Sequence, residues 1–180
     1  MNPPGEISAR SVYTIGHSNH PFEAFLDMLK AHEVKLVADV RTIPKSRHNP
    51  QFNTDILAPA LMDEGIGYRH LPALGGLRHG SKDSVNKGWK NDSFRGFADY
   101  MQTEGFTAGV AELMPAGQEQ RTAVMCAEAL PWRCHRSLIA DALLVREVTV
   151  MHIISRTSVK EHVLTPWARV QGTTITYPRP

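Results

Sequence analysis

Short apolar runs rich in β-branched residues alternate along the chain with longer stretches in which apolar residues recur every three or four positions. The short runs predict strands, at residues 11–16, 35–41, 67–72, 122–128 and 148–154. The longer stretches predict helices, at residues 17–34, 53–65, 134–147 and, as two pieces broken near Gly105, 93–114. Residues 158–178 predict a weak edge strand or an arm. This alternation indicates an α/β fold with a mostly parallel sheet and helices on both faces, a Rossmann-like layering.

Length and composition agree with one domain. The chain has 180 residues, of which 42% are hydrophobic and 21% charged, and a net charge of +2 that says little about partners. We expect a loose tail at residues 1–10 and a single domain at 11–180. The start has no apolar signal segment, and no run approaches the ~18 apolar residues of a membrane span. We therefore expect a cytoplasmic protein without a membrane partner, in which cysteines stay reduced.

Histidine, arginine and cysteine are frequent just after the predicted strands. Ligands of parallel α/β sheets bind at the carboxyl ends of the strands, where the connecting loops meet. The candidate residues at these ends are Gly16, His17, Ser18, Asp39, Arg41, Gly75, Gly76, Cys126, Glu128, Arg133, Cys134, His135 and Arg136. Solvated loops would carry more serine, asparagine and aspartate. We expect a convergent site, with His17, Arg41, Cys126 and Arg136 lining one pocket.

The segment CAEALPWRCHRSLIADAL, residues 126–143, contains both cysteines and allows several interpretations. The helix start near Cys134, with Arg133, His135 and Arg136, could bind a phosphate, sulfate or carboxylate group. A cysteine could instead be a nucleophile, with Glu128 as the nearest acid or base. The spacing from Cys126 to Arg133 is one residue longer than in the protein tyrosine phosphatase loop, so it resembles that loop without matching it.

The two thiols could also form a redox pair, or bind zinc together with His135 and His17, although the spacing fits no familiar zinc pattern. They could equally be core residues, with Arg136 merely holding a loop carboxylate. If one thiol reacts, the sequence favours Cys134, because a helix start and flanking cations stabilise a thiolate. Burial at the end of an apolar strand disfavours the thiolate form of Cys126.

Three residues after the first two predicted strands have similar alternatives. Asp39 and Arg41 face the same side of their strand, so the carboxylate could aim the guanidinium at a ligand or form a structural ion pair. His17 could act as an acid or base near neutral pH, or satisfy a nearby carbonyl. Ser18 is expected to cap the following helix.

Several short motifs together resemble one known family. They are TIGHS near the start, DVR after the second predicted strand, LGG after the third, CAE followed by CHR, HI at 152–153 and TYP at 176–178. This set is similar to the bacterial and archaeal family catalogued as domain of unknown function 488, over residues 11–178. The resemblance implies a compact α/β domain and, from the paired cysteines, an enzyme without an assigned reaction. Its motif positions are Gly16, His17, Ser18, Asp39, Arg41, Cys126, Glu128, Cys134, His135 and Arg136.

We therefore expect a cysteine-dependent enzyme that binds a small anionic substrate, with Arg41 and Arg136 as anion clamps and with no cofactor or metal. The alternatives are a non-catalytic nucleotide- or nucleic-acid-binding module and a thiol redox sensor. The basic loop 78–95 contains Trp89 and Phe94, and such a mixture can follow a nucleic-acid backbone. Asp83 and Asp92 dilute its charge, which favours a solvated loop with Trp89 pinned to the body.

Overall fold

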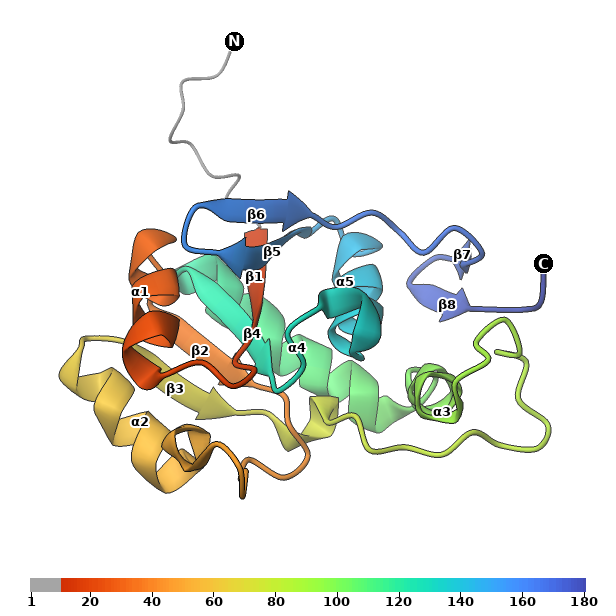
Figure 1. Ribbon diagram of the computed structural model, residues 1–180. Helices are drawn as coiled ribbons and strands as arrows, with labels where there is room; N and C mark the ends of the chain where they lie inside the picture. The colour runs from red at the N-terminus through yellow and green to blue at the C-terminus, as the bar shows by residue number, and fades with distance from the viewer. Residues whose placement is uncertain (1–10) are drawn as a thin grey trace, which may run out of the picture.

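A six-stranded sheet organises the computed structural model, which describes residues 11–180 (Figure 1). The predicted tail at residues 1–10 lies outside the described residues. The strands are β1 (Ser11–Gly16), β2 (Leu36–Asp39), β3 (Gly67–His70), β4 (Thr122–Cys126), β5 (Thr149–Ser155) and β6 (Ser158–Glu161). Their order is β3-β2-β4-β1-β5-β6, and only the β5–β6 pair is antiparallel. The mostly parallel sheet expected from the sequence is confirmed.

Five helices cover the two faces of this sheet (Figure 1). They are α1 (Phe22–Ala31), α2 (Thr54–Asp63), α3 (Asp92–Tyr100), α4 (Glu104–Glu119) and α5 (Arg136–Leu144). Apolar residues of α1 and α2 share one core cluster with Ile15, Val37 and Met125. Those of α3, α4 and α5 share the other with Val12 and Val124. Alternate strand residues thus face opposite cores, as the two-residue period requires.

Most of the predicted strands extend too far at their carboxyl ends. β2 ends at Asp39 rather than at 41, β3 at His70 rather than at 72, and β4 at Cys126 rather than at 128. The chain leaves the sheet there and turns into the loops and short 3₁₀ turns η1 (Pro50–Phe52), η2 (Pro72–Leu74) and η3 (Pro131–Arg133). The residues just beyond the strands therefore belong to the loops.

Helix boundaries also differ from the predicted ones. α1 begins after Pro21, and Ser18 lies in a left-handed conformation with φ 48° and donates its hydroxyl to Asn19, so the predicted serine cap is wrong. α5 begins at Arg136, because Cys134 has extended backbone after η3. The break expected near Gly105 lies at residues 101–103 instead, where the side chain of Thr103 caps α4.

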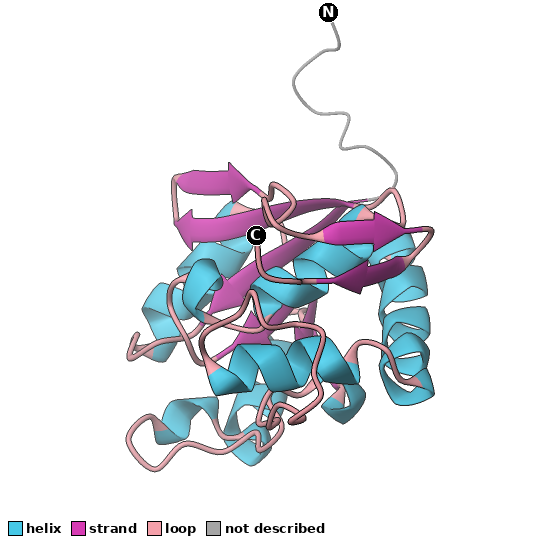
Figure 2. Ribbon diagram, turned by 90° about the vertical axis from the view of Figure 1, so that its right-hand side faces the viewer, coloured by secondary structure: helices cyan, strands magenta, loops and turns pink. Residues whose placement is uncertain are grey.

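The carboxyl-terminal segment forms the predicted edge strand and continues beyond it. β6 pairs with β5, and β7 (Arg169–Gln171) with β8 (Thr174–Thr176) form a separate two-stranded unit (Figure 2). Tyr177 is fully buried, and its backbone N–H donates to the side chain of Asn86 at 2.8 Å. This bond ties the end of the chain to the loop before α3.

Gly16 brings the loops after β1 and β4 together. The His17 and Ser18 amides donate to the carbonyls of Cys126 and Ala127, both at 2.9 Å, and so extend the β1–β4 pairing into the loops. A Cβ atom on Gly16 would lie 1.9 Å from the carbonyl oxygen of Glu128. Only glycine permits this approach, which places residues 16–18 against the start of the cysteine loop.

Candidate functional site

A pocket of about 390 Å³ opens at the carboxyl ends of the strands. The predicted site residues that line it are His17, Arg41, Gly76, Cys126, Glu128, Arg133, Cys134 and His135. They follow β1, β2, β3 and β4, so the expected convergence of the four loops occurs. Ser18, Asp39, Gly75 and Arg136 are not among its lining residues. These four support the pocket from behind or beside it.

The two cysteine sulfurs lie in direct contact inside the pocket wall. Cys126 Sγ is 2.7 Å from Cys134 Sγ, and both thiols are free and buried. An S–S bond would measure about 2.05 Å, so no disulfide joins the two sulfurs in this structure. The backbone N–H of Arg136, at the start of α5, also donates to Cys134 Sγ at 3.5 Å. Cys134 thus has two hydrogen-bond donors available to stabilise a negative charge on its sulfur.

His135 faces Cys134 with its unprotonated nitrogen. Its Nε2 lies 3.2 Å from the Val40 carbonyl oxygen and 3.0 Å from that of Leu74, and these acceptors assign the proton to Nε2. The Nδ1 lone pair therefore faces Cys134 Sγ, 3.5 Å away, and can accept its proton. A Cβ atom on Gly76 would come within 2.8 Å of Nδ1, so glycine makes room for the ring. Gly75 is buried, and a Cβ atom there would lie 2.4 Å from Thr42 Oγ1, so glycine permits the close packing of the two loops.

Arg136 is fully buried and points under the cysteine loop. Its Nη2 donates to the backbone carbonyls of Glu128 at 2.6 Å and Ala129 at 3.2 Å, and its Nη1 donates to Thr14 Oγ1 at 3.1 Å. The predicted anion clamp at Arg136 is therefore wrong: the side chain is occupied by carbonyls that turn inward beneath the pocket. A pair with the Glu128 carboxylate is not formed either, since that group accepts from the Leu130 amide.

The charge of Arg136 is not balanced by a carboxylate. Among residues 11–180 its hydrogen-bond partners are neutral oxygens, and its Nε has no hydrogen-bond partner in that range. A buried cation is costly unless an opposite charge lies near it. A thiolate at Cys134, two residues earlier, would provide that charge.

The pKa values of the two thiols are shifted in opposite directions from the ordinary thiol value. Burial raises the pKa of both, but at Cys134 the S–H of Cys126, His135 and the Arg136 charge outweigh burial and hold the pKa well below the ordinary thiol value. Burial and the adjacent Cys134 sulfur hold the pKa of Cys126 well above it. This is the order of acidity that the sequence favours, while the reactivity of either thiol stays a prediction.

Asp39 fixes the guanidinium of Arg41 from behind. Arg41 donates from Nε to Oδ1 at 2.9 Å and from Nη2 to Oδ2 at 2.6 Å, and Nη2 also donates to the Phe52 carbonyl at 2.7 Å. Tyr68 donates its hydroxyl to the same carboxylate at 2.5 Å. Burial would lower the pKa of Arg41, but Asp39 raises it overall. The pair therefore holds a fixed, locally neutralised guanidinium in the pocket wall.

His17 is a neutral imidazole rather than an acid. Its Nδ1 donates to the Ser18 carbonyl at 2.8 Å, so Nε2 carries the lone pair, and Arg41 Nη1 approaches that lone pair at 3.4 Å. The ring stacks on Phe52 with centroids 4.2 Å apart. Burial lowers the pKa of His17 to about 4. The expectation that His17 titrates near neutral pH is therefore not supported by its surroundings.

The mouth of the pocket combines cations with apolar side chains. Lys45, Arg133 and Glu128 are exposed there, beside Ile43 and Leu77. Phe94 also lines the pocket. The sequence gives no signal for Ile43 or Leu77, because isolated apolar residues in loops have no periodicity. Their exposure beside a cysteine pocket suits a ligand that has an apolar part as well as an anionic one.

A family profile matches residues 21–143, well over half of the chain. The chain belongs to the family described as Domain of unknown function DUF488. The DUF488 match includes both cysteines and the Asp39–Arg41 pair, whereas His17 precedes it and the HI and TYP motifs follow it. A comparison with curated proteins finds no match to this chain. A comparison with solved structures finds none either.

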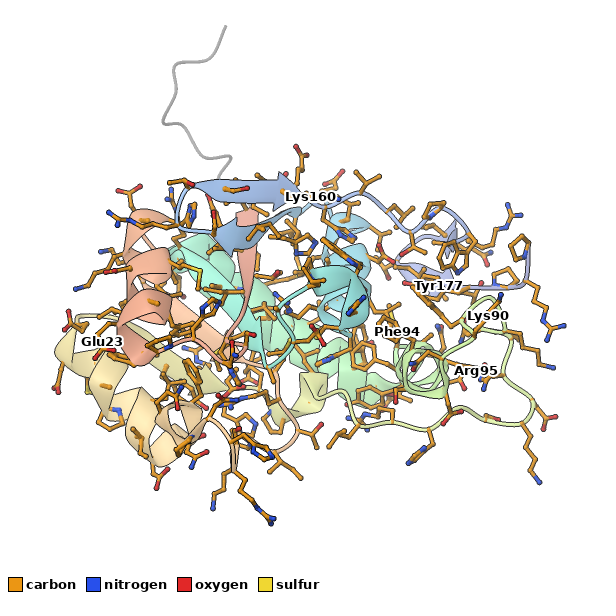
Figure 3. The ribbon with its side chains drawn as sticks, viewed as in Figure 1. Glu23, Lys90, Phe94, Arg95, Lys160 and Tyr177 are labelled. Carbon is orange, nitrogen blue, oxygen red and sulfur yellow. The ribbon has the colours of Figure 1, made fainter. Side chains whose placement is uncertain are left out.

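The basic loop before α3 is held by aromatic packing. Trp89 contacts Phe94, Trp167 and Tyr177, with ring centroids 4.9, 5.0 and 5.5 Å apart. Lys90, Arg95 and Tyr177 lie at the end of the molecule opposite Glu23 (Figure 3). Trp89 is thus pinned to the body of this DUF488 domain, which leaves it a poor platform for stacking bases.

The described part of the chain offers neither a cluster of metal ligands nor a membrane-spanning helix. Within residues 11–180, no three or more histidine, cysteine, aspartate or glutamate side chains cluster so that they could hold a metal ion. In the same range, no helix has the length and apolar character needed to cross a membrane.

The buried, neutral His17 predicts an acid-sensitive contribution to stability. Its pKa is about 4 in the folded state against 6.5 for the ordinary side chain, so the unfolded chain binds more protons as the pH falls below 6.5. Between pH 6.5 and 5 the wild type should lose about 1.5 kcal/mol more unfolding free energy than His17→Gln. Urea denaturation at several pH values measures this difference, and parallel curves for the two proteins would contradict it.

Proposed function

We propose that this DUF488 protein is an enzyme that binds a small anionic substrate in the pocket and attacks it with the Cys134 thiolate. The observation that carries the proposal is the set of groups around Cys134 Sγ: Cys126 Sγ at 2.7 Å, His135 Nδ1 at 3.5 Å and the Arg136 backbone N–H at 3.5 Å. Each of them stabilises a thiolate or accepts the proton that forms it. A low-pKa thiolate at the wall of a pocket is the form in which cysteine acts as a nucleophile.

The neighbouring groups suggest how the proton would move. His135 Nδ1 takes the Cys134 proton, and the bonds from Nε2 to two carbonyls keep the imidazole in the tautomer that can do so. Cys126, whose pKa is raised by burial, remains a thiol and donates to the thiolate. After attack, the imidazolium of His135 can return its proton to a leaving group. Glu128, exposed at the mouth, is a candidate base for a water molecule that later releases the product from the sulfur.

The charges at the mouth support an anionic substrate. Lys45 and Arg133 are exposed cations that line the pocket, while the charge of Arg41 is largely balanced by Asp39. An anionic group is therefore best placed toward Lys45 and Arg133, with Arg41 as a fixed hydrogen-bond donor in the wall. Ile43 and Leu77 would contact the apolar part of such a substrate.

A second candidate function is a reversible dithiol–disulfide reaction, which the 2.7 Å contact between the sulfurs favours. The Cys134 thiolate attacks one oxygen of a peroxide, breaks the O–O bond and becomes a sulfenic acid while hydroxide or alkoxide leaves. The Cys126 sulfur then attacks the sulfenic sulfur, and its proton leaves with the hydroxyl group as water. The product is a disulfide that needs little motion of either residue. A nucleic-acid-binding module is less favoured, because Trp89 is packed away.

The thiolate proposal predicts selective alkylation of one cysteine. Near neutral pH, iodoacetamide should label Cys134 at least about tenfold faster than Cys126, with mass spectrometry assigning the site. Cys126→Ala removes the S–H donor and should raise the pKa of Cys134 by about one unit. Cys126→Ser keeps a donor at that position and is the matched control. Equally slow labelling of both cysteines in the wild type would remove the case for a nucleophile.

The anion proposal predicts protection of the thiolate. Inorganic phosphate should slow the alkylation of Cys134, and Arg133→Ala or Lys45→Ala should raise the phosphate concentration needed by about fivefold, as expected for loss of one exposed charge contact. Lys30→Ala removes an exposed lysine that pairs with Glu64 on the surface and serves as the control. Protection that is unchanged in both pocket variants would argue against an anion at the mouth.

The redox alternative predicts coupled loss of both thiols. Treatment of the wild type with about one equivalent of hydrogen peroxide should produce an intramolecular Cys126–Cys134 disulfide, which dithiothreitol reverses. Cys126→Ser cannot form it and should accumulate the sulfenic acid of Cys134 instead, which excess peroxide converts to higher oxides. If the wild type forms the same higher oxides with no disulfide, the dithiol reaction is excluded and the nucleophile proposal stands alone.

A further inference from the structure

Four buried or nearly buried side chains outside the pocket continue from Arg136 as one hydrogen-bonded series. Arg136 Nη1 lies 3.1 Å from Thr14 Oγ1, and Thr14 Oγ1 lies 2.6 Å from His152 Nδ1. His152 Nε2 then lies 3.0 Å from His162 Nδ1, and His162 Nε2 lies 2.7 Å from Asp141 Oδ1. Thr14 and His152 are paired across β1 and β5, on the sheet face that α5 covers. The series thus joins the guanidinium beneath the cysteine loop to a carboxylate on α5.

The carboxylate end of the series is an obligatory acceptor. Besides His162, Asp141 accepts from the Thr165 amide at 3.1 Å, the Thr165 hydroxyl at 2.7 Å and the Tyr177 hydroxyl at 2.8 Å. Asp141 is fully buried, and donors approach both of its oxygens. Asp141 is therefore the acceptor in each of these bonds.

The bonds at the two ends of the series have a fixed direction. Asp141 Oδ1 accepts from His162 Nε2, and Arg136 Nη1 donates to Thr14 Oγ1. A neutral His152 carries one N–H, so it either accepts the Thr14 hydroxyl proton at Nδ1 or donates from Nδ1 to Thr14 Oγ1. In both arrangements His152 holds the Thr14 hydroxyl, and Thr14 Oγ1 keeps a lone pair for Arg136, a side chain that can only donate.

We propose that Thr14 and His152 are positioning residues that hold the Arg136 guanidinium in place and thereby keep Cys134 in its thiolate form. Without the Thr14 hydroxyl, Arg136 Nη1 loses the side-chain acceptor that orients it, and without His152 the hydroxyl loses a partner that fixes it. Thr14 and His152 are 1% and 4% exposed, and burial lowers the pKa of His152 to about 3, so the ring stays neutral. The inference rests on the proposed thiolate function of Cys134.

The groups that set the acidity of Cys134 belong to several elements. Cys126 from β4, His135 and Arg136 from the start of α5, and the pocket residues His17, Arg41, Glu128 and Arg133 all lie around it. His152 itself faces His162, Lys160 and Arg136. Thr14 carries no charge, so a change at Thr14 can alter the pKa of Cys134 only through the groups that it holds.

The test is the pH dependence of Cys134 alkylation by iodoacetamide in Thr14→Val, an isosteric change that removes the hydroxyl. The pKa obtained from the rate should rise by about one unit, so that labelling below the wild-type pKa slows by about tenfold. Thr14→Ser keeps the hydroxyl and should behave as the wild type. His152→Leu removes the same Thr14–His152 bond from the other side and should give the same shift, should Thr14→Val fold poorly.

The variant Tyr177→Phe distinguishes a positioning role from a general loss of folding stability. It removes one donor to Asp141 and should lower the melting temperature, but it leaves the bonds from Arg136 to Asp141 intact and should not move the pKa of Cys134. Two results would overturn the positioning role alone. One is an equal rise in the Cys134 pKa in Tyr177→Phe. The other is a low Cys134 pKa in the wild type that does not rise in Thr14→Val or His152→Leu. An ordinary thiol pKa for Cys134 in the wild type would overturn the proposed function itself.

Discussion

The buried guanidinium of Arg136 is the constraint on which the rest of the site depends. It turns the carbonyls of Glu128 and Ala129 inward, and that turn brings the chain so close to β1 that Gly16 can have no side chain. It also places a positive charge near Cys134, and within residues 11–180 its hydrogen-bond partners are neutral oxygens. The shape of the loop therefore depends on a cation that the fold has removed from water. The same cation acts together with the S–H of Cys126 and with His135 to lower the pKa of Cys134.

The parallel sheet supplies the other half of the site. Four strands end at the same edge, and the loop after each contributes one residue or residue pair to the pocket or to its support. β1 leads to a neutral His17, β2 to the Asp39–Arg41 pair, and β4 to Cys126. The turn after β3 provides Gly76, which leaves room for the ring of His135. Because these residues directly follow strands of a buried sheet, the sheet fixes the positions of the groups around the pocket.

Much of this arrangement could be predicted from local pattern. Short apolar runs gave the strands, and the two-residue period placed Asp39 and Arg41 on one side. The inward direction of Arg136 could not be predicted, because backbone carbonyls of residues 128 and 129 decide it and carbonyls leave no signature in a sequence. Thr14, Asp141 and His152 lie within apolar elements and look like core residues. The hydrogen-bonded series through them forms only when β1, β5 and α5 come together.

The central claim is that Cys134 is ionised in the resting protein. The ultraviolet absorbance of thiolates, titrated with pH in the wild type and in Cys134→Ser, measures this most directly. We predict a thiolate signal that is already present near neutral pH in the wild type, that disappears only on acidification, and that is missing near neutral pH in Cys134→Ser. A signal that rises in both proteins only near the ordinary thiol pKa of about 8.5 would contradict the account.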